Sequence, residues 1–144
     1  MLFRSGRAAL RLSDGTTIPL DQNTHLIIRG LAPKGRAIQI ELLSGSIKVA
    51  TGASSPIQIV TPHGQVDTAG GDFAVKVTPQ QASLSVFDGK VGVSNPEGSL
   101  QLHGDETAFF AQLSAPKRDI TVKPRDMVQW VVQYPAIQIG RAHV

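Results

Sequence analysis

The sequence predicts an all-β protein of about 10 to 12 short strands in a β-roll, solenoid-like or sandwich arrangement, followed by one short C-terminal helix. Three observations lead to this fold class. Apolar and polar residues alternate in one short segment after another, which is the pattern of strands with one buried face. Turn residues rich in Gly, Asp and Asn separate these segments at a spacing of roughly ten residues. No helical period of useful length interrupts residues 1–122, which argues against a parallel sheet built from βαβ units.

The expected strands follow one another through most of the chain. In order they are Leu10–Leu12, Ile18–Leu20, Ile38–Leu42, Ile47–Val49, Ile57–Ile59, Phe73–Val77, Leu84–Val86, Val91–Val93 and Leu100–Leu102. Neighbouring side chains in a strand point to opposite faces, so the alternation also predicts which side chains face the core. Five are expected to point inward: Phe73, Val75, Val77, Leu84 and Val86.

Glycines mark the expected turns. Asp88-Gly89 separates two alternating segments, and we expect Gly89 to adopt a positive φ in a hairpin turn, because glycine reaches that conformation without strain. Ser44-Gly45-Ser46 is expected to be a turn as well.

The composition changes near the end of the chain. We expect a β-domain over residues 1–113 and a second part over residues 114–144. In that second part, Ser114–Arg118 has the composition of a linker, and Ile120–Val122 alternates like a last strand. Residues 136–144 are expected to be a frayed tail.

A short helix is expected between Pro124 and Pro135, because proline suits the first turn of a helix and cannot continue one. Four apolar residues at i, i+3, i+4 and i+7 spacing form one stripe along this helix and are a possible docking surface: Met127, Trp130, Val131 and Tyr134. Two interpretations are open. The stripe packs on its own β-domain, or it docks on a domain that follows.

Length and composition narrow the class of protein. The 144 residues are the size of one domain, and 41% hydrophobic with 17% charged residues is typical of a folded chain. The sequence has no cysteine, which excludes disulfide scaffolds and thiolate chemistry. The net charge is +3, but no basic cluster exceeds Lys117-Arg118 and only 5% of residues are aromatic, so nucleic-acid binding is not expected.

Targeting and membrane signals are not evident in the sequence. No apolar run approaches the ~18 residues of a membrane span. The first seven residues lack the apolar core of a secretory signal. We therefore expect no direct membrane insertion by this segment.

The sequence lacks several common catalytic motifs. The sequence has no Gly-rich phosphate loop, no dinucleotide-binding glycine motif and no G-x-S-x-G nucleophile motif. Four serines fall in turn-like contexts, where hydrogen bonding to the turn explains them: Ser44, Ser46, Ser54 and Ser55. We therefore expect a protein that is not an enzyme and that holds no cofactor or metal.

A metal-dependent hydrolase is the weaker alternative within the enzyme class. His63 and His103 each precede a glycine, and three aspartates lie near them in sequence: Asp67, Asp72 and Asp105. The carboxylate pairs Asp105–Glu106 and Asp67–Asp72 are the candidates for acid–base work. Such work needs burial and a shifted pKa, which nothing in the sequence predicts.

The order of several segments resembles FecR-type domains. They are Leu2–Thr24, Ile40–Val49, Ile57–Gly64 and Phe87–Val93, within residues 2–110. Each motif is weak alone, but four in the right order are moderately specific. One departure is Gly71-Asp72, where the family usually has Gly-Thr before the strand that starts at Phe73. The ending Asp126–Pro135 is similar to the segment that follows FecR domains in envelope proteins with tetratricopeptide repeats.

The resemblance implies a non-catalytic periplasmic module of the cell envelope that works by protein–protein contact in signalling or assembly. In the regulators of this family, the domain follows a membrane span and relays receptor occupancy to a sigma factor. The implied partner is a receptor, an adjacent repeat domain or a transmembrane regulator. The alternative from another class is a glycan- or peptidoglycan-binding module, for which Trp130 and Tyr134 are the available aromatic platforms.

Overall fold

The computed structural model describes residues 2–3, 8–11, 17–21, 23–30, 38–50, 56–68, 70–119, 123–124 and 136–138. These residues form thirteen strands and contain no α-helix. In chain order the strands are β1 (Leu2–Phe3), β2 (Ala8–Arg11), β3 (Thr17–Leu20), β4 (Thr24–Gly30), β5 (Ile38–Ala50), β6 (Ile57–Thr61), β7 (Gly64–Thr68), β8 (Gly71–Val77), β9 (Ala82–Asn95), β10 (Gly98–His103), β11 (Glu106–Ala111), β12 (Ser114–Arg118) and β13 (Ala136–Gln138). The all-β prediction is confirmed.

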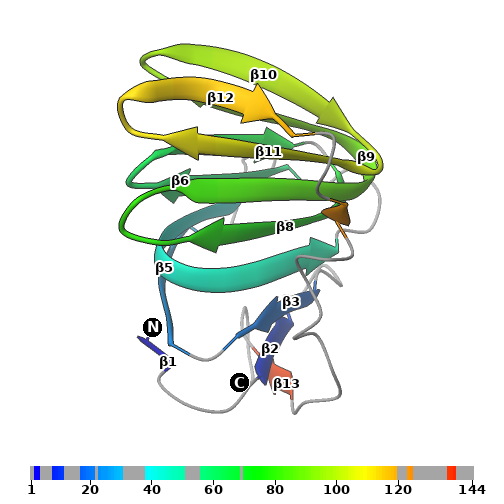
Figure 1. Ribbon diagram of the computed structural model, residues 1–144. Coiled ribbons are helices and arrows are strands. Elements are labelled where there is room, and N and C mark those ends of the chain that lie inside the picture. The colour runs from blue at the N-terminus through cyan, green and yellow to red at the C-terminus, as the bar shows by residue number, and fades with distance from the viewer. Residues whose placement is uncertain are drawn as a thin grey trace.

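The strands form two layers that share two long strands. Sheet A has the order β1-β4-β5-β6-β7-β9-β10, and sheet B has the order β13-β2-β3-β5-β8-β9-β11-β12. The first half of β5 pairs in sheet A and its second half in sheet B, whereas β9 runs from sheet B into sheet A. The result is a roll in which strands are stacked from β2, β3 and β13 at one end to β10 and β12 at the other (Figure 1).

Glycines with positive φ lie where the shared strands pass between the sheets. Gly45 in β5 has φ 97°, and a Cβ at this position would lie 2.4 Å from Thr24. Gly89 in β9 has φ 91° and pairs with Gly71 of β8, so two glycines meet where the strands bend. Glycine permits this geometry because it has no Cβ to clash.

The turns predicted at Gly89 and at Ser44-Gly45-Ser46 are bends within a strand and not reversals of the chain. Gly89 has the predicted positive φ, but β9 continues through it instead of reversing in a hairpin. Likewise, Ser44-Gly45-Ser46 is a bend within β5, and Ser46 is buried. The same residue types serve a bend within a strand and a turn between strands, so the sequence alone does not separate them.

The core lies between the two sheets. From sheet B, the five residues predicted to point inward are all buried: Phe73, Val75, Val77, Leu84 and Val86. From sheet A, the facing set includes Leu26, Ile40, Leu42, Ile59, Val66, Val91, Val93 and Leu102. The predicted phase of these five positions is confirmed, because all five belong to the hydrophobic core cluster and the residues between them, Ala74, Lys76 and Ser85, do not.

The C-terminal part departs from expectation where it is described. Ser114–Arg118, expected as a linker, forms β12 and pairs with β11. Pro116 made a strand look unfavourable here, because proline cannot donate a backbone hydrogen bond. An edge strand tolerates a proline, because one of its sides has no partner strand. Ala136–Gln138, expected in a frayed tail, forms β13 beside β2. The predicted strand Ile120–Val122 and helix residues 125–135 lie outside the described residues.

No helix among the described residues has the length and apolar character needed to cross a bilayer.

Replacing Phe73 by Ala is expected to lower the free energy of unfolding by about 3–5 kcal/mol, since the ring is fully buried between the sheets. Urea denaturation followed by circular dichroism measures this change. Lys76→Ala, on the exposed side of the same strand, is the control and should change stability by less than about 0.5 kcal/mol. Equal effects of the two changes would contradict the assignment of the core.

Replacing Gly89 by Ala is expected to cost about 1–3 kcal/mol, because its φ of 91° strains any side chain and the new Cβ would lie 3.0 Å from the Gly71 Cα. Gly92→Ala in the same strand is the matched control. A Cβ there meets no atom closer than 3.9 Å, and its φ is not in the positive region, so the change should be tolerated. If both variants unfolded at the same urea concentration, the positive φ assigned to Gly89 would be contradicted.

Candidate functional site

The sequence-predicted docking stripe lies outside the described residues. This concerns Met127, Trp130, Val131 and Tyr134, all within the helix predicted between Pro124 and Pro135. Pro124 itself is described and is buried.

The two glycine-flanked histidines do not converge. His63 lies in the β6–β7 turn, where its Nε2 atom is 2.7 Å from the carbonyl oxygen of Thr78 and Asn95 donates to its backbone carbonyl. His103 lies at the opposite end of the same sheet, where it pairs with Lys90. No group of three His, Asp or Glu residues in the described part of the chain could hold a metal ion. The structure therefore gives the hydrolase alternative no support.

The carboxylates proposed as acid–base pairs each face a different partner. Asp67 accepts hydrogen bonds from the side-chain amides of Gln58 and Gln65. Asp72 forms an ion pair with Lys48, whose Nζ also lies 5.1 Å from the centre of the Phe87 ring. These contacts hold the side chains on the surface of the roll.

The other proposed pair is divided in the same way. Asp105 lies 3.5 Å from Lys123, and Glu106 lies 3.1 Å from Arg118. These two neighbours thus bind cations from different segments of the chain, as expected for structural ion pairs.

The outer face of sheet B carries two neighbouring rows of side chains that differ in size and exposure. Cross-strand pairing arranges its side chains in rows that run across the strands. We call Ala74, Ser85 and Thr107 the closed row, because all three are buried. The adjacent row contains Lys76, Ser83, Phe109 and Lys117, and we call it the open row, because both lysines are exposed and Phe109 is half-buried, although Ser83 between them is buried.

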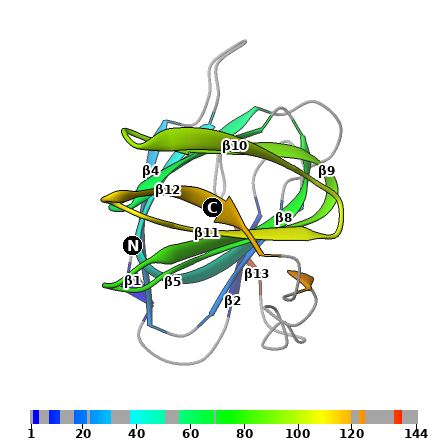
Figure 2. The ribbon, with the colours of Figure 1, turned by 45° about the horizontal axis from the view of Figure 1, so that its top comes forward.

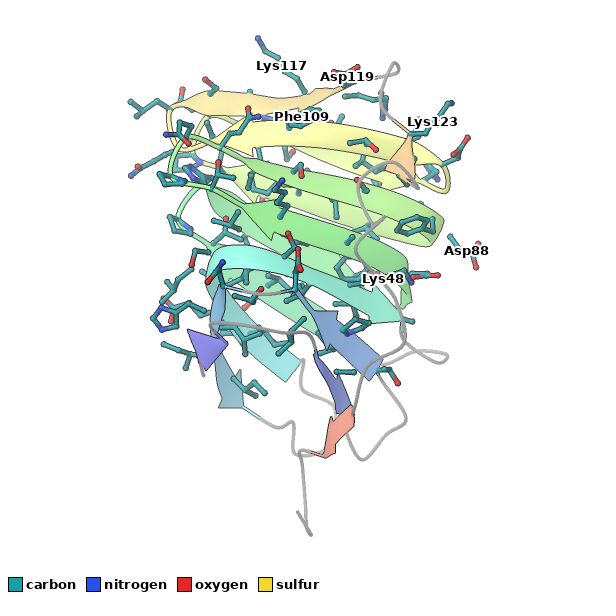
Figure 3. All side chains as sticks on the ribbon, turned by 60° about the horizontal axis from the view of Figure 1, so that its bottom comes forward. Lys48, Asp88, Phe109, Lys117, Asp119 and Lys123 are labelled. Atoms are coloured by element: carbon teal, nitrogen blue, oxygen red, sulfur yellow. The ribbon has the colours of Figure 1, made fainter. Side chains whose placement is uncertain are left out.

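The open row borders two hollows beside Phe109. The larger, of about 590 Å³, is lined by Gln81, Phe109, Lys117, Arg118 and Asp119. The smaller, of about 110 Å³, is lined by Lys76, Thr78, Gln81, Ala82, Ser83 and Phe109. Since both share Gln81 and Phe109, we treat them as one feature, the Phe109 hollow. Figure 3 shows Phe109 on this face with Lys117 beyond it.

The turn that follows β11 carries an exposed apolar side chain. Leu113, in the turn that joins β11 to β12, is 84% exposed and is the one large hydrophobic residue so exposed in the described part. Asn95 holds this turn, since its side-chain amide donates to the carbonyl oxygens of Ala111 at 2.8 Å and Ser114 at 2.7 Å. Separately, the half-buried Phe109 ring has an exposed lysine on either side in its row, and such a surface suits a partner that is apolar at the centre and acidic at the rim.

Phe109 was not among the residues predicted from the sequence, although the sequence contains a signal for it. Phe109 and Phe110 are consecutive in a strand, so the two rings must point to opposite faces. Phe110 is in the core, which leaves Phe109 outside.

The outer face of sheet A is different in character. Two hollows there share Asp67, Gly92 and Gln101, and their described lining includes no aromatic side chain. Gly92 has no side chain, and its neighbours across the sheet are polar. The described residues of this surface do not include the aromatic stacking platform that the glycan alternative calls for. At the end of the roll β10 and β12 lie next to each other (Figure 2), and a Cβ on Gly98 would lie 3.2 Å from that of Ala115.

Comparisons with known proteins agree with this architecture. Two crystal structures of a candidate anti-sigma factor from Parabacteroides distasonis are similar in fold, each with a TM-score of 0.75 and 20% sequence identity. Each match covers 90% of this chain and 62% of the crystallised chain, so this chain spans less than two thirds of that protein. No curated protein matches the sequence.

The sequence also matches the family described as "FecR protein" over residues 3–92. This range includes the strands from β1 to the middle of β9 and therefore both glycine bends. The chain belongs to the FecR family.

Proposed function

We propose that this chain is a non-catalytic regulatory module that works by protein–protein contact in cell-envelope signalling or assembly, on the periplasmic side of the membrane. Membership of the FecR family supports a regulatory signalling role. The anti-sigma description of the structural neighbours points in the same direction. The partner is a protein of the envelope: a receptor, an adjacent repeat domain or a transmembrane regulator.

The single observation that supports the contact mechanism is the Phe109 hollow, with an exposed lysine on either side of the ring in the open row. Aromatic side chains in a partly buried setting provide most of the binding energy in many interfaces, and a polar rim then excludes water around them. Here the rim is basic, because Lys76 and Lys117 lie on either side of Phe109 in the open row. The preferred partner segment therefore carries an apolar side chain flanked by Asp or Glu.

The ordered strands around the hollow suit this role. Phe109 is on β11, which pairs with β9 on one side and β12 on the other, so its position is set by a continuous ladder. A rigid surface loses little conformational entropy on binding, which favours affinity. No polar cavity is needed for such a function.

The test compares variants of the full chain as bait for periplasmic extract, with captured proteins identified and their affinities measured. Phe109→Ala is expected to weaken the captured complex by about 2 kcal/mol, or roughly 30-fold, and Lys117→Glu to weaken it further at low salt. Gln101→Ala and Gln101→Glu, on the exposed outer face of sheet A, are the matched controls and should bind like the native chain.

Two outcomes would overturn the proposal. One is a partner that binds all variants equally, which would place the contact elsewhere. The other is saturable binding of cell-wall fragments that quenches or shifts Trp130 fluorescence, which would favour the glycan alternative. Circular dichroism of each variant confirms that a lost contact does not reflect lost folding.

A further inference from the structure

β10 is an edge strand of sheet A. Among the described strands it pairs with β9 alone, so the backbone groups on its other side have no ladder partner there. The side chains of Ser99, Gln101 and His103 are exposed, so the strand lies at the surface. An unpaired strand edge is a template on which a strand of another molecule can pair.

The sequence of β10 lacks the features that protect most strand edges. Natural edges carry charged residues, prolines or bulges that interrupt further pairing. β10 reads Gly-Ser-Leu-Gln-Leu-His, with no Lys, Arg, Asp, Glu or Pro. It also pairs with β9 along its whole length without a shift of register. Short uncharged segments that alternate in this way favour strand addition.

β12, the neighbouring edge strand of sheet B, differs in this respect. Its five residues include Pro116, Lys117 and Arg118, and its pairing with β11 shifts register. A proline offers no N–H to a new strand, and a bulge breaks the regular spacing of the ladder. β12 therefore protects its own edge, whereas the protection of β10 has to come from other strands.

Two charged side chains from other strands bind the outward backbone groups of β10. The Arg118 guanidinium of β12 donates to the Gln101 carbonyl oxygen at 2.9 Å. The His103 backbone N–H donates to the Glu106 carboxylate of β11 at 2.7 Å. Alternate residues of an antiparallel strand turn their backbone groups to the same side, so the backbone groups of Ser99 face this open edge as well.

The same two side chains also hold each other. The Arg118 Nε atom lies 3.1 Å from Glu106 Oε2, while Arg118 Nη2 and Glu106 Oε1 bind the β10 backbone. One planar guanidinium thus contacts a carboxylate and a carbonyl at once, a geometry that a lysine ammonium does not reproduce. We call Glu106 and Arg118 the edge latch. Since both side chains are about one third exposed, the latch lies at the surface and not in the core.

We infer that the edge latch keeps β10 from pairing with β10 of a second copy of this chain, and that loss of the latch turns β10 into a dimer interface. An antiparallel pair with its two-fold axis at Gln101 fits the edge best. Ser99 of each copy then faces His103 of the other, and Leu100 faces Leu102. All outward backbone groups of β10 are paired in this register, and the two uncharged strands do not repel each other.

The first test measures self-association of the full chain by sedimentation equilibrium. The native chain is expected to be monomeric. Arg118→Ala should associate roughly tenfold more tightly or more, because it frees the Gln101 carbonyl and removes the cation from Glu106. Arg118→Lys keeps the charge but not the fork of donors, so its association should be intermediate.

Lys90→Ala is the matched control for this test. It removes the same charge from an exposed position on β9, next to His103, but leaves the edge latch intact. It should remain as monomeric as the native chain. The partner of the Phe109 hollow is absent from these samples, so the result does not depend on the proposed function.

The second test identifies the strand and its register, and it uses the fact that the chain has no cysteine. Gln101→Cys combined with Arg118→Ala should form a disulfide-linked dimer on mild oxidation. Directly opposite residues of such a pair have Cα atoms about 5.5 Å apart, which is within disulfide range. Gln101→Cys with the latch intact should link several-fold more slowly. Ser99→Cys with Arg118→Ala is the register control and should not link efficiently, because Ser99 faces His103 of the other copy.

Four outcomes would overturn the inference. They are a folded Arg118→Ala variant that stays monomeric, equal association of Lys90→Ala, equally fast linking of Gln101→Cys with and without the latch, and equal linking from Ser99→Cys. Circular dichroism establishes that each variant is folded. If Arg118→Ala does not fold, the milder Arg118→Lys variant takes its place in both tests, and a folded Arg118→Lys chain that associates no more than the native chain contradicts the inference equally.

Discussion

The fold depends on two long strands that each serve two sheets. β5 and β9 pass from one layer to the other at Gly45 and Gly89, where a positive φ lets the backbone bend without a break in pairing. Strands that pair with β9 must bend at the same place. On one side the chain passes from β7 to β8 through Gly70 and Gly71, and on the other from β10 to β11 through Gly104 and Asp105.

The same pairing organises the surface. Since the bends fix the register of β8, β9 and β11, they also fix which outward side chains form a row. One row is small and buried, and the next carries Phe109 between lysines. On the proposed function, the Phe109 hollow in the open row faces a partner protein.

Sequence reasoning predicted the features that depend on local pattern. Alternation correctly placed Phe73 and Leu84 in the core, because a strand's side chains have a fixed period of two. It did not distinguish a bend from a turn at Gly89, since that depends on whether the next residues continue a pairing far away in the sequence. It also assigned Ser114–Arg118 to a linker, because a short edge strand with a proline has little alternation to detect.

The candidate site was less predictable than the core. Phe109 becomes notable only when Lys76, from a strand more than thirty positions earlier, is placed two strands away in the same row. Which side chains become neighbours depends on the register between the strands. The alternation fixes only which face each side chain occupies, so registers that differ by two residues remain equally compatible with it. The predicted stripe around Trp130 was derived from helical spacing alone and lies outside the described residues.

Strand sharing has a mechanical consequence. Neither layer can be removed without cutting β5 and β9, so loss of order in one sheet withdraws the ladder partners of the other. The roll should therefore melt as a single cooperative unit, with no state in which one sheet persists alone. A module of this kind moves as one rigid body when a force is applied at one of its ends. Such rigid-body movement would suit a protein that transmits a signal from one binding partner to another.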